Sequence, residues 1–299
     1  MTRSRSAGIA LSRAKVCLYL AAIAILLWVL ASAPSWPVTI VGSVLLGITF
    51  AHGLELQHEA LHGILFKTDA GNRLLGSILG FPMLATYTDT RVRHLLHHRY
   101  NGTEQDVFDR RCHDFRSGRD ILGHVFDFGR LPSFVAMIWS LQVGRYRGPL
   151  GNASRELART ELLVTAAGMA ALLMLSLWFN PGLALWGWIV PALVVAPPCH
   201  FLMTSAEHLG RPASRRLDVN TRTYRAPGLW RYLIHYDNYH VEHHLRPSLP
   251  FHLLPAFHAE RCRRAGEQAP GYRQSMRDVF RAMAACVQAS PQGSSTGRT

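Results

Sequence analysis

The chain has 299 residues, of which 48% are hydrophobic, and its formal net charge is +13. The basic residues lie almost entirely outside the apolar tracts, and no zinc-finger spacing, helix-turn-helix pattern or aromatic-basic RNA signature accompanies them. This arrangement argues against nucleic acid as a partner and favours positive flanks that orient membrane helices and contact anionic lipid.

Two long tracts, 16–54 and 162–206, contain no Lys, Arg, Asp or Glu. Each is long enough to cross a bilayer twice, because one crossing needs about 20 residues. The sequence therefore predicts an all-α integral membrane protein with four transmembrane helices in two hairpins. The helices are expected at about 16–33, 38–60, 161–179 and 183–203.

The basic segment 1–15 precedes the first helix. A charged start, an apolar run and Ala31-Ser32-Ala33 are also typical of a cleaved signal peptide. Pro34 would directly follow that cut, and the run is long enough to span, so we favour a retained helix. By the positive-inside rule the N-terminus is then cytoplasmic, as are 61–160 and 204–288, which would form a helical cap.

The remaining segments are expected to be interfacial or disordered, and the cysteines are expected to be unpaired. The apolar segment 74–87 is broken by glycines and a proline, which predicts a re-entrant or interfacial element, and 131–143 is expected on the membrane surface. The five cysteines form no CxxC pair, so we expect unpaired thiols. The tail 289–299 is rich in Ser, Gly and Gln and is predicted to be disordered, on the cytoplasmic side.

Sixteen histidines are present, and eight of them lie in three short stretches. Residues at i, i+3 and i+4 share one face of a helix, so each stretch directs its imidazoles the same way. Imidazole is a favoured ligand of iron, zinc, copper and nickel, and eight nitrogens are too many for one ion. The sequence therefore predicts two metals. The stretches comprise His58 and His62; His94, His97 and His98; and His240, His243 and His244.

The order HxxxH, HxxHH and HxxHH resembles the membrane fatty acid desaturase and hydroxylase superfamily. The resemblance covers roughly residues 52–255, within a single domain expected at 16–288, and its most specific part is the run from Asn238 to Pro250. It implies a non-haem di-iron centre held by histidines alone, with O2 as co-substrate. It also implies a hydrophobic substrate and a separate electron donor of the ferredoxin, rubredoxin or cytochrome b5 type.

The family's ligand positions carry over onto the eight clustered histidines and onto His208, which follows the last hairpin. Some relatives have an asparagine four residues before that histidine; here the position is Thr204, so the role is not carried over. Whether Thr204 or His52 joins the site stays open. The carboxylates and amide expected to orient ligands are Glu59, Glu207, Asn238 and Glu242, with Glu55 and Asp237 as further neighbours. The histidines expected to be structural or exposed are His113, His124, His200, His235, His252 and His258.

The resemblance implies O2-dependent desaturation of an unactivated C–C bond in a fatty acyl or lipid-like substrate. Alternatives on the same site are a hydroxylase, a ketolase, or a desaturase of a small metabolite such as the vinyl-ether amino acid rhizobitoxine. A zinc metalloprotease is a rival because His58-Glu59-x-x-His62 matches HExxH, yet it leaves both HxxHH stretches unexplained. A metal carrier would need polar ligands within the spans, where the apolar tracts offer only His52 and His200.

Overall fold

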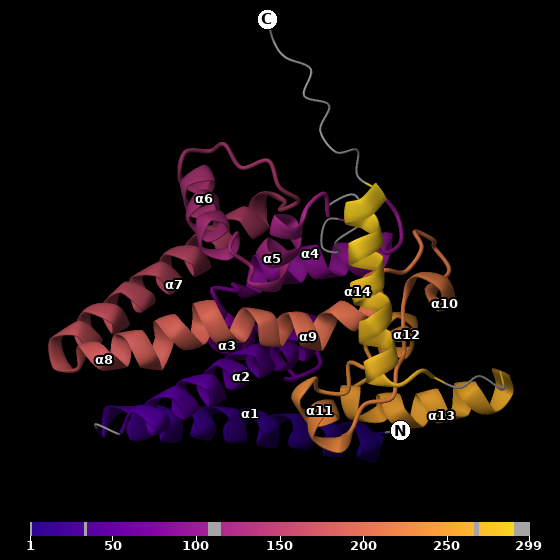
Figure 1. Cartoon of the computed structure of the whole chain (residues 1–299), viewed down its shortest axis with the longest axis horizontal. Helices are drawn as coiled ribbons and strands as arrows, with labels where there is room; N and C mark the ends of the chain where they lie inside the picture. The colour runs from indigo at the N-terminus through magenta and orange to yellow at the C-terminus, as the bar shows by residue number, and fades with distance from the viewer. Residues whose placement is uncertain (1, 33–34, 107–114, 266–268, 290–299) are drawn as a thin grey trace, which may run out of the picture.

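The computed structural model describes residues 2–32, 35–106, 115–265 and 269–289 (Figure 1). Within these ranges the chain is helical, and no strand longer than an isolated bridge occurs. The predicted all-α fold is confirmed. The tail 290–299, Cys112 and His113 lie outside the described residues.

Four helices are long and apolar enough to cross a membrane, as predicted. The first and third helices start earlier than the charge-free tracts, because a helix continues through the polar interface while hydropathy marks only the stretch inside the hydrocarbon core. The pair α5 (Gly118–Val125) and α6 (Arg130–Gln142) passes the same test when taken together and would be a fifth span, although its two halves are bent by 75°. The helices that build the four spans are α1 (Thr2–Ala31), α2 (Trp36–Leu61), α7 (Asn152–Phe179), α8 (Pro181–Ala184) and α9 (Ala196–His208).

The fourth span is not a regular α-helix. Between α8 and α9 it passes through two π-helical segments, Leu185–Ile189 and Pro191–Val195. Proline removes a backbone donor and its ring crowds the carbonyl four residues earlier, so prolines at 191, 197 and 198 favour the wider turn. The span nevertheless reaches His208, which is the last residue of α9.

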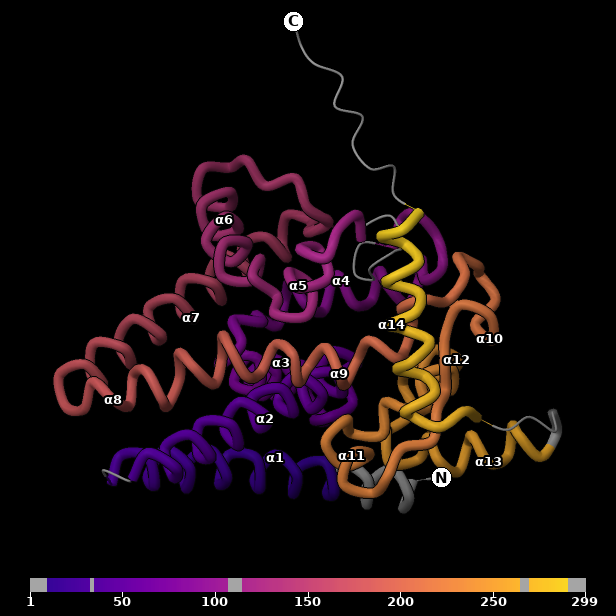
Figure 2. Tube along the Cα trace, in the orientation of Figure 1, coloured from indigo at the N-terminus to yellow at the C-terminus, as the bar shows by residue number. Residues whose placement is uncertain are grey.

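Helix α2 is the centre of the bundle, with α1, α3 (Asp69–Gly80), α9 and the second π-helical segment packed around it. Lipid gives helices no hydrophobic reason to associate, so close packing at small residues holds them together. Gly47 is such a residue, because a Cβ there would lie 2.5 Å from the Val195 Cβ and 3.0 Å from the Pro191 carbonyl oxygen. Figure 2 shows α2 running between α1 and α9.

Gly47→Ala is therefore expected to destabilise the bundle by about 1–3 kcal/mol, the usual cost of overpacking. The measurement is the thermal unfolding midpoint of the full chain in detergent. Gly123→Ala is the matched control, because a Cβ there meets nothing within 4 Å. Equal midpoints for both variants would show that the contact between α2 and the fourth span is loose.

The C-terminal helices lie at the end of the spans opposite the turn between α7 and α8, whereas α5 and α6 lie above α7 and α3 lies beside α2 (Figure 1). The predicted surface segment 131–143 corresponds to α6, and 74–87 falls in α3 and a short 3-10 turn, neither of which qualifies as a span alone. The cap and connecting helices are α3 (Asp69–Gly80), α4 (Tyr87–Tyr100), α5 (Gly118–Val125), α6 (Arg130–Gln142), α10 (Leu217–Asn220), α11 (Gly228–Leu233), α12 (His240–Leu245), α13 (Leu254–Ala265) and α14 (Tyr272–Ala289).

The cysteines differ from expectation at one position. Cys17, Cys199 and Cys262 are free thiols, whereas Cys286 is disulfide-bonded. The prediction that every thiol is unpaired is wrong for Cys286, because spacing along the chain does not show which cysteines meet in space.

Candidate metal centre

The three histidine stretches and His208 converge from four elements. His58 lies in the last turn of α2 and His62 caps that helix, while α4 carries the second stretch and α12 the third. His208 ends α9. All nine predicted ligands are thus brought to one end of the apolar helices.

The nine imidazoles divide into two groups of ligand atoms, within each of which all atoms lie within 4.8 Å of one another. The five-histidine group is His58, His62, His94, His98 and His243. The four-histidine group is His97, His208, His240 and His244.

The HxxHH spacing explains the division. In each helix the pair at i and i+4 serves one group and the residue at i+3 serves the other. On α4 the five-histidine group takes His94 and His98, and on α12 the four-histidine group takes His240 and His244. Because α4 and α12 contribute to both groups, neither helix can shift without disturbing both.

Within each group the Nε2 atoms face one another. In the five-histidine group His94 Nε2 lies 2.7 Å from His62 Nε2 and 2.8 Å from His58 Nε2. In the four-histidine group His208 Nε2 lies 3.2 Å from the Nε2 atoms of His97 and His244. Two ligands about 2.1 Å from one ion and at right angles to each other are about 3.0 Å apart, so these separations suit metal ligands.

Carboxylates hold the opposite ring nitrogen, Nδ1, of three of these histidines, His58, His97 and His240. Asp237 bridges the groups: its carboxylate oxygens lie 2.9 Å from His58 Nδ1 and 2.8 Å from His240 Nδ1. Asp106 lies 2.8 Å from His97 Nδ1. An Nδ1–H that donates to a carboxylate leaves a lone pair on Nε2. Facing lone pairs repel one another, and a bound cation removes that repulsion.

Burial also keeps the rings ready to bind metal. Desolvation lowers the pKa of His94, His98 and His243 well below the usual histidine range, and the neighbouring imidazoles lower each pKa further. Burial raises the pKa of the Asp237 carboxyl, but attraction to His240 and His58 and their hydrogen bonds outweigh it and hold that pKa well below its usual range. Neutral imidazoles with oriented rings are what a metal site requires.

Three of the four side chains predicted to orient ligands contact other groups instead. Glu59 lies 2.9 Å from His235 Nε2, and Glu242 contacts Thr223, His258 and Arg261. The Asn238 amide donates to the Tyr224 carbonyl. Only Glu207 approaches a ligand, with its carboxylate 3.5 Å from His240 Nε2.

The two open positions fall outside both groups. His52 Nδ1 contacts the Leu233 carbonyl, and the Thr204 hydroxyl donates to the His200 carbonyl within α9. Among the histidines expected to be structural, His235 pairs with Glu59 and His258 with Glu242.

Asp106 is the residue that sequence reasoning missed. It lies in the loop after α4, eight residues beyond His98, at a spacing that no helical pattern links to a ligand. Asp237 was more accessible, because it precedes His240 by three residues. Asp237 is accordingly among the predicted neighbours of the third stretch, whereas a search for acidic residues would have had to extend into the loop after α4 to reach Asp106.

Comparison with known proteins gives a matching picture. A family model described as fatty acid desaturase matches residues 34–279, which include all nine clustered histidines. The chain is also similar to dihydrorhizobitoxine desaturase of Bradyrhizobium elkanii, with 27% identity over 248 residues that cover 77% of this chain and 68% of the relative.

Proposed function

Because the chain belongs to the fatty acid desaturase family, we propose that it is a membrane di-iron oxidoreductase that uses O2 to desaturate a C–C bond. The observation that carries the proposal is the pair of histidine groups, one fully and one partly buried, that Asp237 joins. Imidazole suits several transition metals, and iron is the one that supplies O2 chemistry in this family.

The reaction balances with one O2. Desaturation removes two hydrogen atoms, that is two protons and two electrons, from the substrate; a donor protein supplies two more electrons, and with two further protons both oxygen atoms leave as water. Hydroxylation consumes the same reductant but leaves one oxygen atom in the product. Both outcomes begin with hydrogen abstraction, so hydroxylase or ketolase activity remains the alternative on this site.

The protein's own residues position the metals and keep the site dry. Asp237 and Asp106 hold ligand rings by their Nδ1–H groups, so each Nε2 keeps its direction. His94, His97, His240 and His243 are buried. Burial excludes bulk water and so protects a strongly oxidising reaction from side reactions.

The geometry disfavours the zinc protease. In that chemistry the glutamate of HExxH must activate a water on the metal. Here one Glu59 oxygen lies 2.9 Å from His235 Nε2, and the other accepts a hydrogen bond from the Phe251 amide. Lys15 completes this buried chain, with its Nζ 2.8 Å from His235 Nδ1. Glu59 thus links α1, α2 and the cap rather than facing the metal groups.

A fatty acyl or lipid-like substrate is the first candidate, and one observation favours a small polar metabolite as the second. Glu55 lies one helical turn from His58 inside the span and is only 2% exposed. Its single ion-pair contact among the described residues is His200 Nε2, at 3.6 Å. An ionisable residue within a span usually marks a substrate or ion path. The relative's name, dihydrorhizobitoxine desaturase, also supports a small polar metabolite as the substrate.

Glu55→Leu separates the two substrates. If a polar substrate uses Glu55, its turnover should fall at least tenfold, which is about the value of one hydrogen bond to a charged group. Desaturation of a saturated acyl lipid should then be unchanged. The measurement is product formation by mass spectrometry from dihydrorhizobitoxine and from dipalmitoyl phosphatidylglycerol, with Glu55→Gln as the shape-matched variant. Acyl turnover that falls in parallel would assign Glu55 a structural role.

We place the histidine groups and both termini on the cytoplasmic side. The support is the charge pattern: the segments flanking the cap are rich in arginine, whereas the turns at the other end carry no charge. A separate ferredoxin, rubredoxin or cytochrome b5 type protein would deliver electrons by docking on this basic face.

The proposed reaction is tested by its need for oxygen. Membranes that contain the protein, a reduced ferredoxin system and a deuterated saturated substrate should form, in air, a product that has lost two deuterium atoms. No such product should form under nitrogen. His208→Ala membranes provide the blank. Product formation that persists without O2 would contradict the oxidoreductase.

A further inference from the structure

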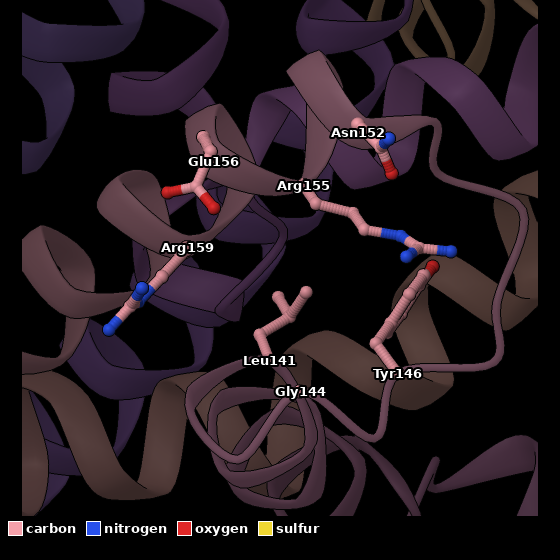
Figure 3. A pocket seen from close by; sticks show the side chains of 7 residues that line it. All are labelled: Leu141, Gly144, Tyr146, Asn152, Arg155, Glu156 and Arg159. Carbon is pink, nitrogen blue, oxygen red and sulfur yellow. The ribbon is translucent and has the colours of Figure 1, made fainter.

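A second polar site lies away from the histidine groups, at the junction of α6 and α7. It is a pocket of about 270 Å³, and Figure 3 shows Arg155 and Tyr146 on one side, Glu156 and Arg159 on the other, and Leu141 between them. The lining residues are Leu141, Gly144, Tyr146, Asn152, Arg155, Glu156 and Arg159.

Both arginines are oriented by neutral oxygens. Arg155 Nε donates to the Leu150 carbonyl at 2.9 Å. Arg159 donates to Gln142 Oε1 from Nε at 3.0 Å and from Nη2 at 2.6 Å. Neither guanidinium forms an ion pair among the described residues, so both positive charges remain available. With Glu156 as the one carboxylate in the lining, the pocket carries a net positive charge.

The pocket lies at the depth of lipid headgroups. Arg159 precedes Leu162, where the charge-free tract begins, by three residues, or about 5 Å along a helix. Helix α6 supports this depth with an apolar stripe at four-residue spacing, which is between 40% and 67% exposed. Such a stripe on a helix is typical of insertion at the bilayer surface. The stripe consists of Leu131, Val135 and Trp139 of α6 and of Val143, the C-cap residue of that helix.

We propose that this pocket binds one anionic glycerophospholipid, whose phosphodiester contacts Arg155 and Arg159 while its acyl chains lie along the apolar stripe of α6. Guanidinium groups match phosphate geometry, and each basic residue near an anionic membrane contributes about a fivefold gain in affinity. The Tyr146 ring, 5.5 Å from the Arg155 guanidinium, helps to hold that arginine in place. Through α4, which packs on α7, the lipid would brace the helix that carries the second histidine stretch.

The test is native mass spectrometry of the full chain, delipidated and then titrated with phosphatidylglycerol. Wild type should retain one lipid in preference to phosphatidylcholine. Arg155→Gln with Arg159→Gln should weaken retention by roughly 25-fold, the product of two fivefold losses. Glu156→Gln should strengthen retention, because it removes the only negative charge from the pocket.

Arg147→Gln is the matched control, since Arg147 is an exposed arginine in the loop between α6 and α7 and does not line the pocket. Equal losses for Arg147→Gln and the double variant would overturn the proposal in favour of diffuse charge. Displacement of the lipid by millimolar inorganic phosphate would also overturn it, because the site would then bind a small anion. If the double variant does not fold, Arg159→Lys tests the same point, because lysine keeps the charge but lacks the planar guanidinium. Lipid retention equal to that of wild type would then contradict the proposed contact between the guanidinium and the phosphate.

Discussion

Asp237→Ala is expected to weaken both metal groups at once. One carboxylate holds His58 of the five-histidine group and His240 of the four-histidine group, so its loss frees a ring in each. Removing a residue that orients a metal ligand typically costs 10–100-fold in metal affinity, and here we expect a loss of about that size at both metals. Competition with a chelator, read as metal per chain, measures the loss.

Asp106→Ala is the matched control. Asp106 contacts only His97 among the nine clustered histidines, so its loss should weaken the four-histidine group and leave the other intact. Asp237→Asn should also weaken metal binding, because the neutral amide has only one acceptor oxygen for two Nδ1–H donors. If Asp237→Ala released a single metal, the bridging role would be contradicted.

The second large effect concerns the ligands themselves. His62→Ala should empty the five-histidine group and His244→Ala the four-histidine group, each leaving about one metal per chain. Activity should fall by roughly three orders of magnitude or more in either variant, and the double variant should be no worse, because groups that act as one unit are strongly non-additive.

His124→Phe is the control for these losses, because its ring packs beside Phe115 and Phe201 and belongs to neither group. This variant should keep both metals and its activity. The arrangement of two separate groups would be contradicted if His62→Ala and His244→Ala each released both metals completely.

The four spans could be predicted from the sequence because the lipid bilayer imposes a simple rule. Charge-free tracts must be spans, and uninterrupted hydropathy located all four. The histidine stretches could be predicted as well, since their helical spacing is visible in the sequence. The π-helical path of the fourth span could not be derived, because its prolines were visible but the neighbouring packing that stabilises a wide turn was not.

The supporting residues were harder to predict than the histidines. Glu59 and Glu242 are sequence neighbours of ligands, yet a helical neighbour at i+1 or i−1 points to another face, and both contact other partners. Asp237 lies outside α12 and reaches two histidines from different helices, which only the folded chain shows. The division into five and four likewise depends on how α4 and α12 face each other.

The most direct test of the di-iron proposal is the metal content of the purified full chain after growth with both iron and zinc. Wild type should contain about two irons per chain, the number that two imidazole groups imply. His97→Ala and His243→Ala, which each remove one ligand from a different group, should each lose iron together with activity. A single zinc that survives both substitutions would contradict the proposal.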